Sequence, residues 1–159
     1  MIILVMGVSG SGKTSVGQAL ARRLGCPFTD ADSFHSGANR DKMAAGIPLT
    51  DDDRLPWLRA LAAAIRNAII GGRDHVFACS ALKADYRRIL DPRGECKLVY
   101  LQGSRELLAE RLAARSGHFF NPALLDSQLD TLEEPDDALS VDIAQPLSDI
   151  VQTLMLGLS

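Results

Sequence analysis

A glycine-rich segment near the start of the chain has the residue types and spacing that hold phosphate groups. Residues 7–14 read GVSGSGKT, which satisfies G-x-x-x-x-G-K-[ST], and they follow an apolar run and precede a segment of helical periodicity. Glycines let the backbone curl until successive N–H groups point at a phosphate, and the positive end of the following helix adds to the attraction. The motif therefore predicts a nucleotide site formed by Gly7, Val8, Ser9, Gly10, Ser11, Gly12, Lys13, Thr14 and Ser15.

Two side chains of this phosphate loop (P-loop) are expected to act on the phosphates directly. Lys13 would span the β- and γ-phosphates as a catalytic residue, and the Thr14 hydroxyl would bind Mg²⁺. The alternative is a glycine-rich turn that binds nothing, and it is disfavoured because the lysine and the threonine are both in register.

A P-loop alone leaves open whether a protein is a GTPase switch, an ATPase motor, a small-molecule kinase or a passive nucleotide sensor. The chain has no N-K-x-D motif for guanine, and its lone D-x-x-G match begins at Asp91 in a polar turn, so a GTPase is disfavoured. The third predicted strand ends at Ser80, where a motor ATPase would commonly carry a carboxylate for Mg²⁺. These features disfavour two of the four classes of protein, the GTPase and the motor ATPase. The acids after the second predicted strand bear on the same choice.

Two carboxylates follow that second strand, in the sequence FTDAD. Asp30 and Asp32 lie at its carboxyl end, where open α/β sheets bind ligands. Asp30 would lie near Mg²⁺ through a water molecule, and Asp32 would accept a proton from the attacking hydroxyl of a second substrate. The same acids could instead be solvated, or Asp32 and Ser33 could cap the next helix.

Basic side chains lie where an anionic substrate or a transferring phosphoryl group would need them. Lys83 and Arg87 are four residues apart at a predicted helix start and would share one face. Arg115 could move over the γ-phosphate, while Arg111, one turn earlier, could stack on adenine. These cations could also be merely solvated, or could favour the negative end of their own helix. His118 could contact the substrate as part of a seal over the site, or it could anchor its own segment.

Short apolar runs alternate with longer segments of helical periodicity, as in an α/β protein whose parallel sheet carries helices on both faces. The predicted strands are Ile2–Met6, Pro27–Asp30, His75–Ser80, Lys97–Gln102 and Leu139–Asp142. The predicted helices are Lys13–Leu24, Asn39–Ala45, Asp51–Ile70, Ala84–Leu90, Arg105–Arg115, Pro122–Leu132 and Pro146–Leu156. The segment RSGHFFNPALL, residues 115–125, interrupts this pattern with glycine, asparagine and proline, so a mobile lid is expected over about residues 115–130.

The length, net charge and cysteine content of the chain limit its architecture and its partners. With 159 residues, a single domain over residues 1–159 is expected, and the net charge of −3 gives no reason to expect nucleic acid or an acidic membrane as a partner. The three cysteines are far apart, which suggests neither a disulfide framework nor a zinc site and fits a reducing cytoplasm. The apolar run at the N-terminus is too short for a signal peptide or a membrane span.

Six segments of the chain together carry a family resemblance: MGVSGSGKT, DADSFH, NRDKMAAGIPLTDDDRLPWL, CSALKADYR, RSGHFF and VDIAQPL. They occur together and in order as in the bacterial gluconate kinases, which are small P-loop gluconokinases related to shikimate and nucleoside-monophosphate kinases. The P-loop is shared by many unrelated proteins, whereas the run from NRDKM to DDDRLPWL, followed by CSALK and GHFF, is close to diagnostic. The chain therefore resembles this family over nearly its whole length.

The resemblance implies ATP-dependent phosphorylation of D-gluconate to 6-phospho-D-gluconate with Mg²⁺, usually in a homodimer. It implies a P-loop three-layer sandwich with strand order 2-3-1-4-5 and a lid. It also implies that Asp32 accepts the proton of the substrate hydroxyl, that Arg54 and Arg87 bind gluconate, and that Arg111 and Gln145 bind adenine. The residues after His35 depart from the usual pattern of relatives, so no substrate contact is assigned to them.

The chemistry of gluconate agrees with these assignments. A monocarboxylate with five hydroxyls needs cations for the carboxylate and acceptors for the hydroxyls. Arg54, Arg87 and Lys83 would supply the cations, and Asp32 and Asp53 would supply acceptors. Thr50 and Asp53 also have the spacing of a capping box, so much of the acidic block at residues 51–53 is expected to be structural.

Two other functions stay open at this point. The first is a kinase for another small molecule, such as shikimate or a nucleoside monophosphate, although a chain with 5% aromatic residues offers little lining for a nucleobase as acceptor. The second is a nucleotide-binding regulator without catalysis, which would tolerate the replacement Asp32→Asn.

Overall fold

The computed structural model describes residues 1–116 and 122–159. Its central layer is a parallel sheet with the order β2-β3-β1-β4-β5, which confirms the predicted order. The strands are β1 (Ile2–Met6), β2 (Phe28–Asp30), β3 (His75–Ala78), β4 (Cys96–Gln102) and β5 (Leu139–Asp142). In the centre, Ile2 of β1 is in register with His75 of β3 on one side and with Cys96 of β4 on the other.

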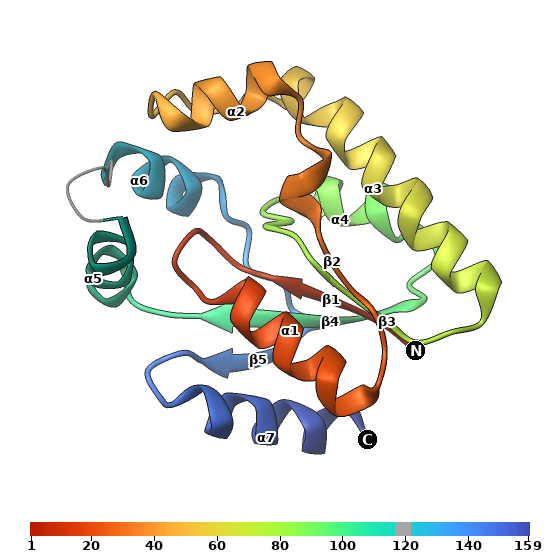
Figure 1. Cartoon of the computed structure of the whole chain (residues 1–159). Coiled ribbons are helices and arrows are strands. Elements are labelled where there is room, and N and C mark those ends of the chain that lie inside the picture. Colours follow the sequence, from red (N-terminus) through yellow and green to blue (C-terminus); the bar gives the residue numbers. More distant parts are fainter. Residues whose placement is uncertain (117–121) are drawn as a thin grey trace.

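Helices cover both faces of this sheet (Figure 1). They are α1 (Lys13–Leu24), α2 (Gly37–Ala44), α3 (Asp51–Gly71), α4 (Ala84–Leu90), α5 (Arg105–Ser116), α6 (Pro122–Thr131) and α7 (Leu147–Leu158). A short 3-10 helix, η1 (Ala31–Phe34), follows β2 and has no counterpart among the predicted elements. Within the described ranges, no helix is long and apolar enough to cross a bilayer.

The alternation of side chains along β1 divides the core into two clusters. Ile3 and Val5 point to the cluster that contains the buried faces of α1, α5 and α7, whereas Ile2, Leu4 and Met6 point to the cluster under α3 and α4. All five residues of β1 are buried. A strand covered on both faces has no polar side, which is why β1 reads as a continuous apolar run.

Most predicted boundaries agree with the structure to within two residues. β1, β5, α1 and α4 have the predicted bounds. α2 begins two residues before the predicted Asn39, because the Ser36 hydroxyl accepts a hydrogen bond from the Asn39 N–H at 3.1 Å and caps the helix. The capping box of α3 is confirmed: the Thr50 hydroxyl accepts from the Asp53 N–H, and the Asp53 carboxylate accepts from the Thr50 N–H, both at 3.0 Å.

The predicted lid is partly described. Its first residues belong to α5, and residues 122–130 belong to α6. Two contacts attach α6 to the rest of the protein: Leu125 is buried in the core, and Asp126 forms an ion pair of 2.6 Å with Arg105 of α5. The mobility of the lid stays a prediction.

Candidate active site

The P-loop runs from the carboxyl end of β1 into α1, as predicted. Gly10 and Gly12 have φ angles of +85° and +91°, in the left-handed region that residues with a Cβ rarely adopt. A Cβ on Gly10 would also lie 2.9 Å from Cγ of Leu112 and 3.1 Å from the carbonyl oxygen of Leu108. The loop therefore needs glycine at position 10 both for its turn and for its close approach to α5.

Lys13 interacts electrostatically with charged groups that the sequence predicts at the phosphates. Its ammonium donates a hydrogen bond to the Val8 carbonyl at 3.0 Å. Desolvation lowers the pKa of Lys13, Asp32 and Asp30 oppose that shift, and Arg115 adds to it. The charges of Asp30, Asp32 and Arg115 therefore all act on the Lys13 ammonium.

The hydroxyl of Thr14, at the end of the P-loop, lies next to the carboxylate of Asp30. The Thr14 hydroxyl donates to Asp30 Oδ2 at 2.9 Å, while Asp30 Oδ1 accepts from the Asp32 N–H at 3.0 Å. The carboxylate of Asp32 is left on an exposed residue at the start of η1. No cluster of three or more acidic, histidine or cysteine ligands occurs in the described part of the chain. A hydroxyl and a carboxylate nevertheless fit Mg²⁺, which commonly keeps several waters and takes one or two carboxylates together with substrate phosphates.

A cavity of about 310 Å³ lies on the other side of the P-loop. Its polar wall contains Arg111, Arg115 and Gln145, and its apolar wall contains Leu147 and Ile150. Arg111 donates to the Ile143 carbonyl at 2.6 Å, and the Gln145 amide donates to the Asp142 carbonyl at 2.7 Å, so both side chains are held by the loop that follows β5. The cavity lies next to the phosphate site, and its walls provide apolar contacts and polar atoms for a flat heterocycle.

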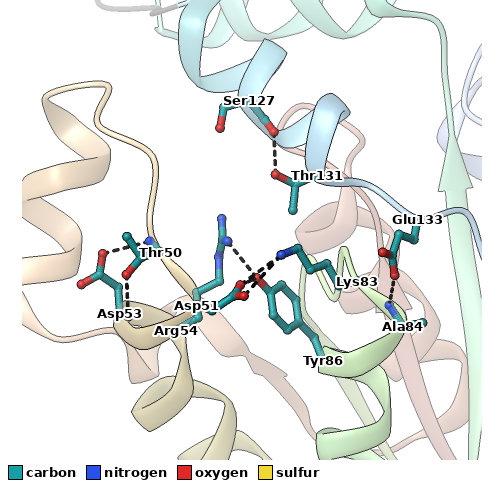
Figure 2. A network of polar contacts seen from close by, with 10 residues as sticks. All are labelled: Thr50, Asp51, Asp53, Arg54, Lys83, Ala84, Tyr86, Ser127, Thr131 and Glu133. Atoms are coloured by element: carbon teal, nitrogen blue, oxygen red, sulfur yellow. Dashed lines mark hydrogen bonds and ion pairs between the residues drawn. The ribbon is translucent and has the colours of Figure 1, made fainter.

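A second cluster of polar side chains joins α3 to the start of α4 (Figure 2). The Arg54 guanidinium donates to the Tyr86 hydroxyl at 2.9 Å, and that hydroxyl donates to Asp51. The Lys83 ammonium donates to both oxygens of Asp51, at 3.2 and 3.4 Å. Both cations also lie 5.5 Å from the centre of the Tyr86 ring. We call Asp51, Arg54, Lys83 and Tyr86 the acceptor cluster.

The charges of the acceptor cluster reinforce one another. The hydrogen bond from Tyr86 lowers the pKa of Asp51, with help from Lys83. The bond to Asp51 raises the pKa of Lys83. Burial raises the pKa of Tyr86, and the bond to Asp51 acts in the same direction. The cluster therefore presents two permanent cations, one carboxylate and one neutral hydroxyl at neutral pH.

Asp53 and Arg87, both predicted to contact gluconate, are engaged with other residues of the protein. Asp53 caps α3 and accepts from the Lys42 ammonium at 2.9 Å, so its oxygens are engaged within the fold. Arg87 donates to the carbonyl oxygens of Ala81, Leu82 and Glu133, at 2.7, 3.3 and 2.9 Å. Lys83 and Arg87 thus do not converge on one partner, although they are four residues apart. His118 lies outside the described residues.

Tyr86 and Gln128 were not predicted as part of the site, and His35 has a place in the core. Tyr86 and Asp51 complete the acceptor cluster, and Tyr86 is three residues after Lys83, a spacing that could have suggested it. Gln128 of α6 contacts Ser9 of the P-loop, and no local pattern relates residues 119 positions apart. His35 is buried, stacked on Trp57 at 4.1 Å, which places it in the core beside η1.

Comparisons with known proteins agree with this geometry. A model of the shikimate kinase family matches residues 9–145. A probable gluconokinase of Dictyostelium discoideum is 48% identical over 97% of this chain and 84% of its own length. The thermoresistant gluconokinase of Escherichia coli (strain K12) is 43% identical over 94% of this chain and 89% of its own length.

Solved structures show the same relationship. A gluconokinase from Sinorhizobium meliloti 1021 superposes with a TM-score of 0.87 at 48% identity, covering 98% of this chain and 90% of its own. Shikimate kinase from Aquifex aeolicus superposes with a TM-score of 0.63 at 19% identity, which shows a shared fold alone.

Proposed function

Since the chain belongs to the gluconokinase family, we propose that it transfers the γ-phosphoryl group of ATP to D-gluconate and forms 6-phospho-D-gluconate. The observation that carries this proposal is the acceptor cluster, which adds two cations, a carboxylate and a hydroxyl to a P-loop fold. An aldonate has one carboxylate and a row of hydroxyls, so it matches this set of groups.

The acceptor cluster would bind gluconate by exchanging its internal partners. Within the cluster, Lys83 pairs with Asp51, and Arg54 donates to the Tyr86 hydroxyl. A substrate carboxylate would take over one or both cations, and Asp51 and Tyr86 would then be available to the sugar hydroxyls. Arg54 is the better carboxylate partner, because its planar fork can bind both oxygens at once.

The phosphoryl transfer would be carried out by groups around Lys13. Asp32 would accept the proton of the attacking hydroxyl, because it is exposed and lies next to Asp30 at the carboxyl end of β2, the edge at which parallel sheets bind ligands. Lys13 and Arg115 would neutralise the charge on the transferring group. Thr14 and Asp30 would hold Mg²⁺, which, when bound, offsets the charge of the β- and γ-phosphates.

The remaining predicted residues would act around this centre. Arg111 and Gln145 would contact adenine in the cavity beside the P-loop. Arg87 would position Lys83 and Tyr86 by holding the loop before α4, since its guanidinium binds backbone carbonyls there. His118 stays a predicted substrate contact. We also propose that the protein works as a homodimer in the cytoplasm.

A phosphorylation assay tests the substrate. ADP formation is measured by a coupled assay with gluconate, other aldonates and shikimate as acceptors, and turnover with gluconate should be the fastest. The replacement Asp32→Asn should abolish turnover and leave ATP binding intact. A regulator without catalysis would show no ADP formation with any acceptor.

Shikimate is the second candidate substrate, because the shikimate kinase family model matches most of the chain. It is also a carboxylate with hydroxyls, so the acceptor cluster alone does not exclude it. Faster turnover with shikimate than with gluconate would replace the first proposal by this one.

A further inference from the structure

Gln128 connects α6 to the P-loop by using both ends of its side-chain amide. Its Oε1 accepts a hydrogen bond from the Ser9 N–H at 2.7 Å, and its Nε2 donates to the Ser9 hydroxyl at 2.8 Å. The orientation of the amide is unambiguous, because a backbone N–H can only donate and must therefore face the amide oxygen. One residue of the phosphate loop is thus held at two atoms by a helix that follows it by more than 100 residues.

This contact also determines what the Ser9 hydroxyl can do. The serine oxygen accepts from the Gln128 amide, and a hydroxyl that accepts one bond still has its own hydrogen to donate. The Ser9 N–H, in contrast, is already used by Gln128. The donor that remains at Ser9 is therefore the hydroxyl. Because a P-loop binds phosphate, the acceptor expected for this hydroxyl is a phosphate oxygen.

The position of Ser9 indicates which phosphate that is. Ser9 follows Val8, whose carbonyl holds the Lys13 ammonium at 3.0 Å. In a P-loop the lysine reaches the β- and γ-phosphates, so the part of the loop beside its ammonium faces that end of the nucleotide. We infer that Gln128 is a positioning residue that aims the Ser9 hydroxyl at the γ-phosphate of ATP; this inference rests on the proposed kinase function.

The helix that carries Gln128 is itself held in place. Leu125 is 1% exposed, and Asp126 accepts from Arg105 at 2.6 and 3.1 Å. Beyond the other end of α6, Glu133 donates its N–H to the Leu82 carbonyl at 2.7 Å, and its carboxylate accepts from the Ala84 N–H at 2.8 Å. Because α6 is attached on both sides of Gln128, its amide is held against Ser9 in the geometry described.

The test compares the binding of ADP and of a non-hydrolysable ATP analogue, measured by calorimetry in the absence of acceptor. Gln128→Met, which keeps the length of the side chain without its hydrogen bonds, should weaken the ATP analogue by about tenfold or more, as expected for one hydrogen bond to a charged group. ADP has no γ-phosphate, so its affinity should change much less. Ser9→Ala should produce the same selective loss.

The double variant makes the test specific for positioning. If Gln128 acts through the Ser9 hydroxyl, combining Gln128→Met with Ser9→Ala should cost little more than either change alone. Asp130→Ala, at an exposed position of the same helix, is the matched control and should leave both affinities unchanged. Equal losses for the two nucleotides, or additive losses in the double variant, would overturn the inference.

Failure of this inference is distinguishable from failure of the proposed function. The binding measurements need no acceptor, so they stand even if gluconate is not the substrate. Thermal unfolding of each variant identifies a loss of fold. If Gln128→Met does not fold, Ser9→Ala decides the question, because an unchanged ratio of the two affinities in that variant would refute a γ-phosphate contact.

Discussion

Replacing Arg54 by alanine tests the assignment of the acceptor cluster. In the structure the Arg54 guanidinium donates a hydrogen bond of 2.9 Å to the Tyr86 hydroxyl and lies over the Tyr86 ring. On substrate binding we expect the guanidinium to pair with the gluconate carboxylate. A hydrogen bond to a charged group contributes about 1.5–3 kcal/mol, which corresponds to a loss of roughly 10- to 150-fold in kcat/KM for gluconate.

The P-loop is a separate part of the site, so the KM for ATP should change by less than about threefold, a difference below roughly 0.7 kcal/mol. Steady-state kinetics with each substrate varied in turn measure both values. Arg54→Lys is the matched variant: it keeps the charge but loses the planar fork, so its kcat/KM for gluconate should lie between those of the wild type and Arg54→Ala. Equal increases in the two KM values, or a lysine variant with wild-type kinetics, would refute the reasoning.

Three further predictions concern the P-loop and the core. Lys13→Ala should abolish phosphoryl transfer in a coupled ADP assay, and a near-normal rate would exclude the proposed role. Gly10→Ala should lower the free energy of urea unfolding by at least about 1–2 kcal/mol, the cost of a left-handed residue with a Cβ, because φ is +85° and Leu112 is in contact. Burial lowers the pKa of His35 below its ordinary 6.5, so the unfolded chain takes up the proton first and stability should fall as the pH drops below about 6.5. His35→Gln should flatten this part of the urea-unfolding profile between pH 7.5 and 5.5, and an unchanged slope would contradict the prediction.

Some of the site could be predicted because its signals are local. The P-loop is one continuous segment, and the glycines and lysine that form it are adjacent in the chain. Asp30 and Asp32 follow a strand, and the carboxyl ends of parallel strands meet at one edge of the sheet. The capping of α3 by Thr50 and Asp53 also depends on neighbours three residues apart.

The acidic block at residues 51–53 shows where local signals end. Asp53 was expected to cap the helix and does so, but its pairing with Lys42 depends on how α2 returns to α3. Asp51, its neighbour but one, lies between Tyr86 and Lys83 of a segment more than 30 residues away. These two acids therefore have different roles, because side chains two positions apart in the first turn of α3 point in different directions.

By itself, the sequence determined the parallel sheet, the P-loop and the family of the protein, because apolar periodicity, glycine spacing and long motifs are properties of contiguous residues. Only the tertiary structure decided which cation joins the acceptor cluster and which holds backbone carbonyls: Lys83 and Arg87 are one turn apart, yet they face Asp51 and Glu133. It alone brought Gln128 to Ser9. Such pairings depend on the packing of α3, α4 and α6 around the ends of the strands, and the spacing of residues within one helix does not encode these pairings.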